Sequence, residues 1–337
     1  MNISLLKRLG NIDQLAGIRR QTTDGGLRTI EVYNAAGLRY TLVADRTLDL
    51  YDLSYKGVNF AFHTKNGLHA GRNYTPLGEE FFHYWSAGML ATCGLSSVGA
   101  GCGDESGTHP IHGRIGQTPA EQICTSARWE DDDYRLTVSG EMADTRLYGR
   151  NLLLSRTIET ALNDKTIRIR DTLTNLGPSS EEFMLLYHVN LGHPLLSEHS
   201  RFFSSPIEAC QTAGVPAAPE TIDAPRDDAC EQMYVHKTKT KTCIAGLVND
   251  ELELGFYLAF ETEPLPMLLE WKHFRSGDYV LGIEPCNCNC MGRCKERENG
   301  TIPVIGAYQT IRYNLTFGIA DGRQETDAIE RRAAESR

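Results

Sequence analysis

The stretch that is most informative about the fold is IGAYQTIRYNLTFGI, at residues 305–319. Its odd-numbered positions are mostly apolar, whereas its even-numbered positions are mostly small or polar. Successive side chains of an extended chain point to opposite sides, so this period of two predicts a β-strand with one buried face. The same period is present at residues 251–260 and 166–174.

Further strands are expected along most of the chain, and asparagine, glycine, aspartate and proline separate them. They are placed at residues 27–34, 38–43, 48–56, 122–128, 134–142, 152–160, 183–191, 234–248, 267–273 and 279–284. Short strands at regular intervals are typical of an antiparallel sandwich or barrel. Helical signals are limited to residues 1–9, 77–87 and the charged tail from residue 326, which we expect to be a solvated helix or a frayed end. The sequence therefore predicts an all-β fold with few short helices.

The length and composition fit one large domain. The chain has 337 residues, of which 41% are hydrophobic, enough for a sizeable core. No linker, repeat or change of composition divides it, so we expect a single domain over 1–337 with its core at about 27–319 and a charged tail at 320–337. Two stretches show little periodicity, and we interpret 57–120 as a pocket wall and 204–232 as a surface excursion.

The charge of the chain bears on its partners and its compartment. The net charge of -10 at pH 7 provides no basic field for nucleic acid or for an anionic membrane. The N-terminus lacks the apolar core of a signal peptide, and no apolar run approaches the roughly 20 residues that span a bilayer. We therefore expect a soluble, cytoplasmic protein. The oligomeric state stays open, and a homodimer is one reading.

The chain contains ten cysteines. Four of them, Cys286, Cys288, Cys290 and Cys294, lie within nine residues, and thiolates are good ligands for zinc or an iron–sulfur cluster. Structural zinc sites, however, usually use paired C-x2–4-C knuckles, which this spacing does not match. Metal binding is one reading of this segment, and the other is a reduced, cysteine-rich loop.

A histidine interrupts the apolar run at residues 183–191. If this run is a strand, Tyr187 and Val189 point to the core, and His188 and Asn190 share the other face. Histidine titrates near neutral pH, so His188 can give or take a proton there. The alternative is a histidine at the edge of the core that bonds to a backbone carbonyl.

A carboxylate ends the apolar run at residues 279–284. Glu284 shares a face with Gly282, so a ligand could approach closely over the glycine, and Pro285 would stop the strand and leave the carboxylate at a rim. Semi-buried carboxylates have raised pKa values and can act as general bases near neutral pH. The alternative is a structural ion pair with Lys272 or an arginine.

Two further histidines lie in a turn-rich loop. His109 and His112 flank Pro110-Ile111, and the proline argues against a helix that would bring both onto one metal. A loop histidine that faces a pocket beside Arg114 fits the segment better. The chain has no nucleophile elbow, phosphate-binding loop or dinucleotide fingerprint, so we expect no cofactor and no metal.

Several motifs occur in an order known from one superfamily. They are HG at 112–113, SRTI at 155–158, DTLTNLG at 171–177, YHVNL at 187–191 and IEP at 283–285. This order, over about residues 27 to 319, resembles the aldose 1-epimerase (galactose mutarotase-like) superfamily. The motifs DR at 45–46, GML at 88–90, CGL at 93–95 and PIHGRIG at 110–116 resemble its DUF4432 branch more closely.

The resemblance implies a β-supersandwich whose concave face binds a monosaccharide, and a cofactor-independent aldose mutarotase, which is an isomerase. It implies that Glu284 removes the proton of the anomeric hydroxyl, that His188 protonates the ring oxygen, and that His112 positions the sugar. The further substrate-binding candidates are Arg114, Asn190, Arg46 and Lys272.

Two features depart from the family pattern. His188 lies two residues nearer the following asparagine than the family's second histidine does, which keeps its side of the strand but changes its reach. The order of Arg72-Asn73 is the reverse of the family's Asn-Arg substrate pair. The identity of the sugar, and whether it carries an anionic group, therefore stays open.

Two other functions remain compatible with the sequence. One is a non-catalytic carbohydrate-binding protein on the same fold, since a fold does not determine a function. The other is a metal-dependent sugar lyase or isomerase that uses the cysteine cluster or the histidines.

Overall fold

The computed structural model describes residues 7–69, 78–212 and 220–336, and it is built almost entirely of antiparallel strands. The five-stranded sheet contains, in spatial order, β1 (Gly17–Thr22), β2 (Arg28–Tyr33), β3 (Leu38–Val43), β4 (Asp49–Tyr55) and β5 (Val58–Asn59). The eight-stranded sheet contains β15 (Ser200–Ser204), β18 (Thr242–Asn249), β19 (Leu254–Glu261), β23 (Thr310–Asp321), β12 (Thr166–Asn175), β11 (Asn151–Ala161), β10 (Asp133–Thr145) and β9 (Glu121–Glu130).

A six-stranded sheet completes the main architecture. Its spatial order is β16 (Ile207–Thr212), β17 (Gln232–Thr238), β20 (Met267–Arg275), β21 (Asp278–Cys286), β14 (Met184–Leu191) and β6 (Leu90–Leu95). Two small pairs are β7 (Cys102–Asp104) with β8 (Gly107–His109), and β13 (Glu181–Glu182) with β22 (Val304–Ile305). The described helices are η1 (Ile12–Gln14), η3 (Gly78–Glu80), α2 (Phe81–Tyr84), η4 (Ile115–Gln117), α3 (Arg293–Glu298) and α4 (Arg323–Ala334). The all-β prediction is confirmed.

The segment with the strongest alternation forms the middle of the largest sheet. In β23, Tyr313, Leu315 and Phe317 are buried, as the period of two predicts. The strand begins at Thr310 rather than at residue 305, because residues 306–309 form a turn in which the Gln309 N–H donates to the Gly306 carbonyl at 3.1 Å.

Several other strands differ from the expected ones. The segment 234–248 forms two strands, β17 and β18, which belong to different sheets. Strand β6 lies within the stretch interpreted as pocket wall, and β1, β15 and β16 were also not predicted. Five of the six residues of β6 are buried, so its sequence carries no alternation for a pattern to detect.

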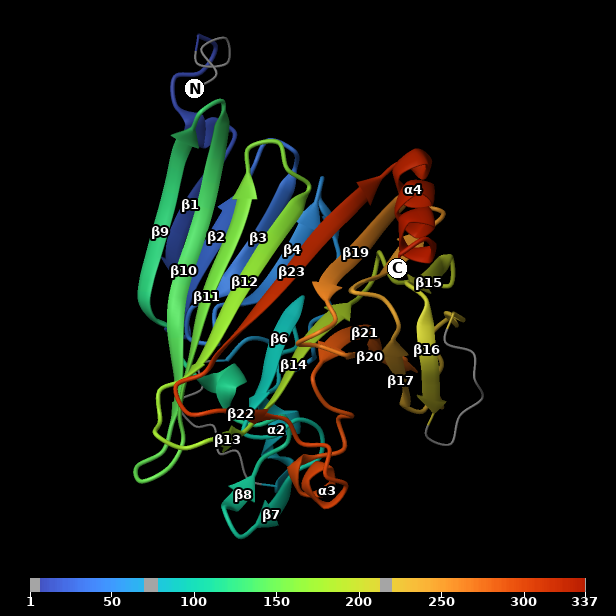
Figure 1. Cartoon of the computed structure of the whole chain (residues 1–337). Helices are drawn as coiled ribbons and strands as arrows, with labels where there is room; N and C mark the ends of the chain where they lie inside the picture. Colours follow the sequence, from blue (N-terminus) through green and yellow to red (C-terminus); the bar gives the residue numbers. More distant parts are fainter. Residues whose placement is uncertain (1–6, 70–77, 213–219, 337) are drawn as a thin grey trace.

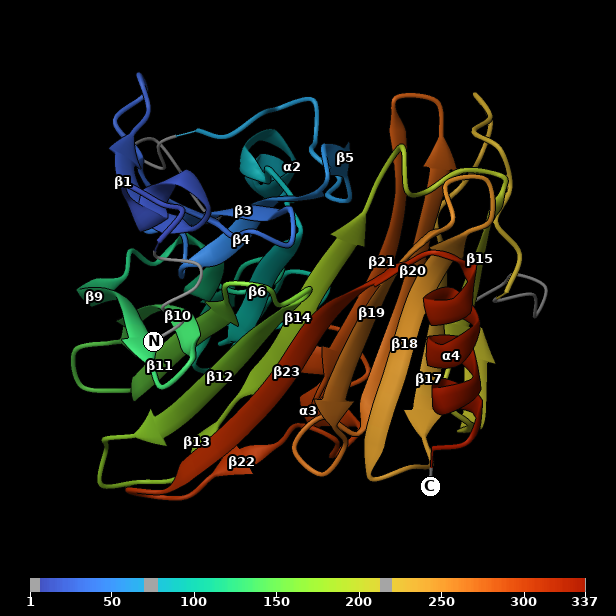
Figure 2. The same ribbon diagram turned by 90° about the horizontal axis from the view of Figure 1, so that it is seen from above.

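The sheets are arranged in layers. The eight-stranded sheet is one continuous layer, and the five-stranded sheet lies behind its β9–β12 half (Figure 1). The six-stranded sheet lies beside the five-stranded sheet (Figure 2). A single hydrophobic cluster joins all three sheets, with Tyr40 from β3, Tyr187 from β14 and Phe317 from β23 among its members. Because the core lies between the layers, the outer face of the six-stranded sheet is left for a site.

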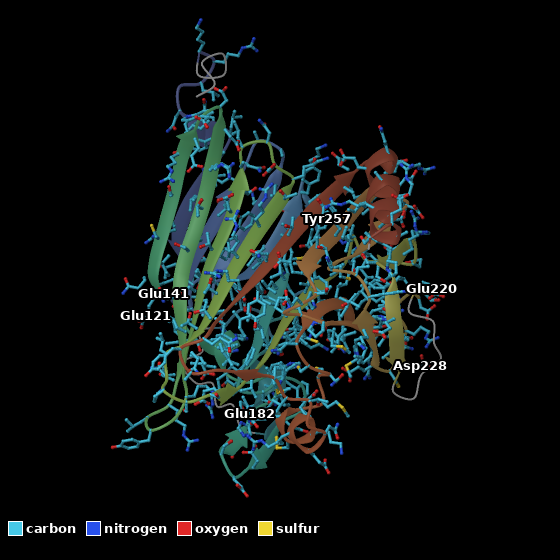
Figure 3. The ribbon with its side chains drawn as sticks, in the orientation of Figure 1. Glu121, Glu141, Glu182, Glu220, Asp228 and Tyr257 are labelled. Atoms are coloured by element: carbon cyan, nitrogen blue, oxygen red, sulfur yellow. A yellow bond between two sulfur atoms is a disulfide. The ribbon has the colours of Figure 1, made fainter. Side chains whose placement is uncertain are left out.

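The tail is not the solvated helix or frayed end that we expected. Helix α4 covers the outer face of the eight-stranded sheet, close to Tyr257 (Figures 1 and 3). Ile329 and Ala333 of the helix are buried against Ile244 and Ala320 of the sheet. The spacing of four between Ile329 and Ala333 places both on one face of the helix, which explains why the helix docks.

A buried arginine connects three sheets. The Arg156 guanidinium on β11 donates two hydrogen bonds to Asp171 on β12 through Nε and Nη2, at 2.9 and 2.7 Å. Its Nη1 donates to Asp49 of β4 at 2.7 Å and to the Thr47 carbonyl at 3.0 Å, and its Nη2 donates to Thr92 of β6 at 2.9 Å. All five guanidinium N–H groups are therefore satisfied at a position where the side chain is fully buried.

A disulfide joins Cys102 of β7 to Cys294 of α3. The prediction of a fully reduced loop is therefore wrong for Cys294. Cys286 and Cys288 are buried free thiols. Across residues 7–69, 78–212 and 220–336, no group of three or more histidine, cysteine, aspartate or glutamate side chains is placed to hold a metal.

We expect Arg156→Met to lower the free energy of unfolding by about 3–5 kcal/mol, because it leaves the Asp171 and Asp49 carboxylates buried without their counterion. Urea denaturation measures this change. The matched control is Arg128→Met, which removes an exposed ion pair with Glu130 on β9 and should leave stability nearly unchanged. A loss at Arg156 as small as that at Arg128 would contradict this role of the network.

Candidate active site

A cavity of about 720 Å³ opens over the outer face of the six-stranded sheet. Aromatic side chains form much of its wall. Trp271 comes from this sheet, Phe62 from the stretch after β5, and Phe81, Phe82 and Trp85 from the segment around α2. His112, His188 and Glu284 also line it. The cavity is thus mostly apolar with a few convergent polar groups, the usual composition of a small-molecule site.

His188 and Glu284 come together because of the register of two adjacent strands. Strands β14 and β21 pair Leu186 with Cys286 and Asn190 with Gly282, which places His188 directly opposite Glu284. The imidazole Nδ1 lies 3.1 Å from the carboxyl Oε1. Both residues are buried, His188 with 5% and Glu284 with 2% of its surface exposed. The pair that the sequence singled out is therefore in direct contact.

The glycine beside Glu284 allows its side chain to fold over the strand. A Cβ atom on Gly282 would lie 2.3 Å from Glu284 Oε1 and 3.1 Å from the Trp271 Cβ. The carboxyl group therefore occupies the space over the glycine that we expected a ligand to use. Strand β21 also continues through Pro285 to Cys286, so Glu284 is enclosed rather than at a rim.

Burial shifts the pKa values of Glu284 and His188 in the directions that favour the uncharged form of each. It raises the pKa of Glu284 well above its usual value, and Glu231 adds to the shift. Burial also lowers the pKa of His188 well below its usual value, and His112 adds to that shift. Neither His188 Nδ1 nor Glu284 Oε1 has a hydrogen-bond partner among the described residues.

Three aromatic rings surround the His188 imidazole. The ring centroids of Trp85, Trp271 and His112 lie 5.0, 5.3 and 5.6 Å from it. Trp85 follows α2, and its Nε1 is enclosed without a partner in the described part of the chain. Trp271 donates its Nε1–H to Glu231. The rings fix the imidazole and exclude water from one side of it.

The His-Gly motif has a structural explanation. The His112 carbonyl accepts a hydrogen bond from the Gly94 N–H at 2.9 Å, and a Cβ atom on Gly113 would lie 2.0 Å from the Gly94 carbonyl oxygen. Only glycine permits this approach. The Gly99 N–H donates to His112 Nδ1 at 3.4 Å, and burial lowers the pKa of His112 to about 4. His112 is therefore neutral at pH 7 and presents Nε2–H as a donor.

Two of the predicted substrate-binding residues lie away from the cavity surface. Asn190 is fully buried, and its Nδ2 donates to the Gly88 and His188 carbonyls at 2.9 Å each. Lys272 lies on the opposite face of β20 from Trp271, where its ammonium contacts Glu270 Oε1 at 3.1 Å. The structure therefore places both residues in supporting positions. Lys272 is one step along the strand from Trp271 and so lies on the other side, whereas Asn190 shares the His188 face and bonds to backbone carbonyls there.

The predicted arginines do not line the cavity either. Arg114 is exposed at the start of η4. Arg46 is buried, donates to the His69 carbonyl at 2.6 Å and borders a separate cavity of about 40 Å³. The smaller cavity shares Phe81, Trp85 and His112 with the main one. Arg72-Asn73 lies outside the described residues.

The interpretation of 57–120 as a pocket wall covers Phe81, Phe82 and Trp85, which line the cavity, but sequence reasoning did not find Trp271 or Glu231. The sequence did carry a signal for Trp271. It lies in the expected strand at 267–273, two residues before His273, so the two side chains are expected on the same face of that strand. Trp85 and Phe81 come from a segment without periodicity, and Glu231 comes from the stretch interpreted as a surface excursion. No local pattern reports that such residues meet in space.

The cysteine cluster lies beneath the site. Cys93, Cys286 and Cys288 pack in one buried hydrophobic cluster, and Cys290 lines the cavity. Burial raises the pKa of Cys93, Cys286 and Cys290 well above the usual value, so these thiols are protonated at neutral pH. They act as apolar filling behind Glu284.

The chain matches one protein family by sequence and several solved structures by fold. A family model described as "Domain of unknown function (DUF4432)" matches residues 24–319. No curated protein sequence matches the chain.

Several solved structures share the fold. A protein from Klebsiella pneumoniae subsp. pneumoniae MGH 78578, described as a "putative aldose 1-epimerase", is 19% identical with a TM-score of 0.85, over 94% of this chain and 86% of its own. A galactose mutarotase-like protein from Clostridium acetobutylicum is 12% identical with a TM-score of 0.62, over 91% and 99%. A galactose 1-epimerase from Lactobacillus acidophilus NCFM is 11% identical with a TM-score of 0.55, over 91% and 99%. At these identities the likeness establishes the galactose mutarotase-like sandwich fold.

We expect Gly282→Ala to separate Glu284 from His188 while the sheet stays intact. The new methyl group would meet Oε1, the far end of a flexible side chain, so the carboxyl group can move at little cost in stability. A crystal structure measures the distance from Nδ1 to the carboxyl, and a thermal melt measures stability. The matched control is Gly255→Ala on β19, where the nearest atom to the new Cβ lies at 3.1 Å and is remote from the pair. An unchanged 3.1 Å contact in Gly282→Ala would contradict the packing argument.

We expect the His112 ring to titrate near pH 4 in the native protein. The unfolded chain takes up this proton near its ordinary pKa of about 6.5. The native state should therefore lose stability as the pH falls from there toward 4. NMR of the imidazole signals, assigned by their absence in His112→Gln, measures the titration. A midpoint between pH 6 and 7 would contradict the burial of a neutral ring.

Proposed function

The chain belongs to the DUF4432 family, and from this membership, the shared fold and the contents of the cavity we propose that it is a cofactor-independent aldose mutarotase. It would interconvert the anomers of a monosaccharide by opening and closing the sugar ring. The observation that carries the proposal is the His188–Glu284 pair, two proton-transfer groups 3.1 Å apart at the base of an aromatic cavity.

The reaction needs two proton transfers and nothing else. One group must remove the proton of the anomeric hydroxyl while another protonates the ring oxygen, which breaks the bond between the anomeric carbon and the ring oxygen. Both sugar oxygens are attached to the same carbon, so the catalytic groups must also be neighbours. Glu284 and His188 meet this requirement, with Glu284 proposed to act on the anomeric hydroxyl and His188 on the ring oxygen.

The remaining lining suits a sugar. Trp85 and Trp271 offer flat apolar faces for the C–H surface of a pyranose or furanose, and His112 offers a donor for a hydroxyl group. The relatives with the same fold include a galactose 1-epimerase, which supports a sugar as the ligand.

The proposal extends to the domain organisation, the compartment and the partners of the protein. We propose a single domain in the cytoplasm that acts on a monosaccharide, without a nucleic-acid or membrane partner. Among the described helices, none is both long and apolar enough to cross a bilayer.

We expect Glu284→Gln to abolish turnover nearly completely, because the amide keeps the shape of the side chain but not its proton chemistry. His188→Asn should lower the rate by about 10²–10⁴-fold, the usual size of a general acid–base contribution. NMR saturation exchange between anomers, across aldoses, deoxysugars, uronates and phosphosugars, measures the rate for each protein.

The control for this experiment is Glu121→Gln, an exposed residue of β9 on a distant part of the fold (Figure 3). It should exchange anomers like the wild type. Wild-type exchange that survives both site substitutions would rule out this site. Sugar binding without exchange anywhere in the panel would favour a non-catalytic carbohydrate-binding protein.

A further inference from the structure

The two atoms at which His188 and Glu284 approach each other are enclosed. His188 Nδ1 and Glu284 Oε1 lie 3.1 Å apart, and neither has a hydrogen-bond partner among the described residues. Both residues line the cavity. With Nδ1 and Oε1 enclosed, Nε2 and Oε2 are the atoms left to meet a ligand.

Among the described residues, Glu284 forms no ion pair with a lysine or an arginine. The titratable groups that interact with the pair are Glu231 before β17, His112 before η4, Cys93 on β6 and Cys290 after β21, and His273 lines the same cavity beyond Trp271. None of the first four carries a positive charge at neutral pH, given the low pKa of His112.

The nearest lysines are engaged with other carboxylates. Lys65, at the cavity wall, contacts Asp278 at 2.8 Å. Lys272 contacts Glu270 on the far face of β20. A carboxylate and an imidazolium enclosed here would lose their hydration, and only their mutual attraction would offset that cost.

We propose that His188 and Glu284 form a neutral proton relay, in which the pair holds one shared proton on Glu284 Oε1 and passes it to His188 Nδ1 during each ring opening. This inference rests on the proposed function, because it describes how the same site would move protons. It differs from two independent acid and base groups in that neither residue becomes charged.

The proton balance of the relay closes. At rest, Oε1 and Nε2 carry protons, and Oε2 and Nδ1 have free lone pairs. The anomeric hydroxyl gives its proton to Oε2, Oε1 gives its proton to Nδ1, and Nε2 gives its proton to the ring oxygen as the bond from that oxygen to the anomeric carbon breaks. The product is an open-chain aldehyde with a new hydroxyl group.

The protein ends the step as a carboxylic acid beside the other tautomer of a neutral imidazole. Rotation about the bond next to the aldehyde, followed by the reverse transfers, closes the ring as the other anomer. The relay therefore needs no water, metal or counterion to regenerate its resting state. It also explains why a buried pair without a lysine or arginine partner can exchange protons with a neutral substrate.

Infrared spectroscopy of the resting protein tests this proposal without any substrate. We expect the carbonyl stretch of a protonated carboxyl at pH 7, absent from Glu284→Gln and retained in Glu231→Gln, which removes the other carboxylate near the pair. In the wild-type protein, nitrogen-15 NMR should show His188 as a neutral imidazole with its proton on Nε2. This second measurement needs no variant, so it decides the question even if Glu284→Gln folds poorly.

An ionised Glu284 with an imidazolium at His188 would overturn the relay even if the protein proved to be a mutarotase. Conversely, a neutral pair in a protein that exchanges no anomers would overturn the proposed function and the catalytic use of the pair. The neutral pair itself would then remain a property of the fold. The spectroscopic result and the exchange assay thus separate the two claims.

Discussion

The site depends on a buried cation on the other side of the sheet that carries it. Arg156 satisfies its five N–H groups with Asp171, Asp49, Thr92 and the Thr47 carbonyl, and so connects β11, β12, β4 and β6. Asp171 also accepts a hydrogen bond from the Tyr187 hydroxyl at 2.9 Å, which adds β14 to the network. One guanidinium therefore sets the positions of strands from all three large sheets.

The connection to the site follows from the geometry of a strand. Tyr187 points inward to Asp171, so the next residue, His188, must point outward into the cavity. Strand β21 then supplies Glu284 opposite His188, and β6 supplies Ala91 on its other side. The motifs in the sequence that resemble the superfamily thus have two kinds of role. Arg156, Asp171 and Tyr187 hold the scaffold, whereas His188 and Glu284 face the cavity.

This division explains how much the sequence could predict. The alternation of apolar and polar residues predicted the strands that have one polar face. Along β14, the same alternation correctly placed His188 outward and Tyr187 inward. Along β20, odd-numbered and even-numbered residues point to opposite faces. If the face of β20 that lines the cavity had been known, this alternation would have excluded Lys272 from the site and selected Trp271 and His273. Strands buried on both faces, such as β6, carry no alternation. The interpretation of 57–120 as a pocket wall covers Phe81 and Trp85, but their meeting with Glu231 depends on long-range packing, which no local pattern encodes. The Cys102–Cys294 pairing depends on such packing too.

The side chains that enclose His188 and Glu284 hold the two groups in place and also determine their protonation states. The rings around His188 and the thiols beneath Glu284 keep water away, which favours neutral groups over charged ones. A crystal structure of Glu284→Gln with a bound aldose tests the account most directly, since the substitution should preserve the cavity but stop turnover. The account predicts that the anomeric hydroxyl lies within hydrogen-bond distance of residue 284 and the ring oxygen within that distance of His188. A sugar bound away from this pair, or one whose anomeric carbon points out of the cavity, would contradict it.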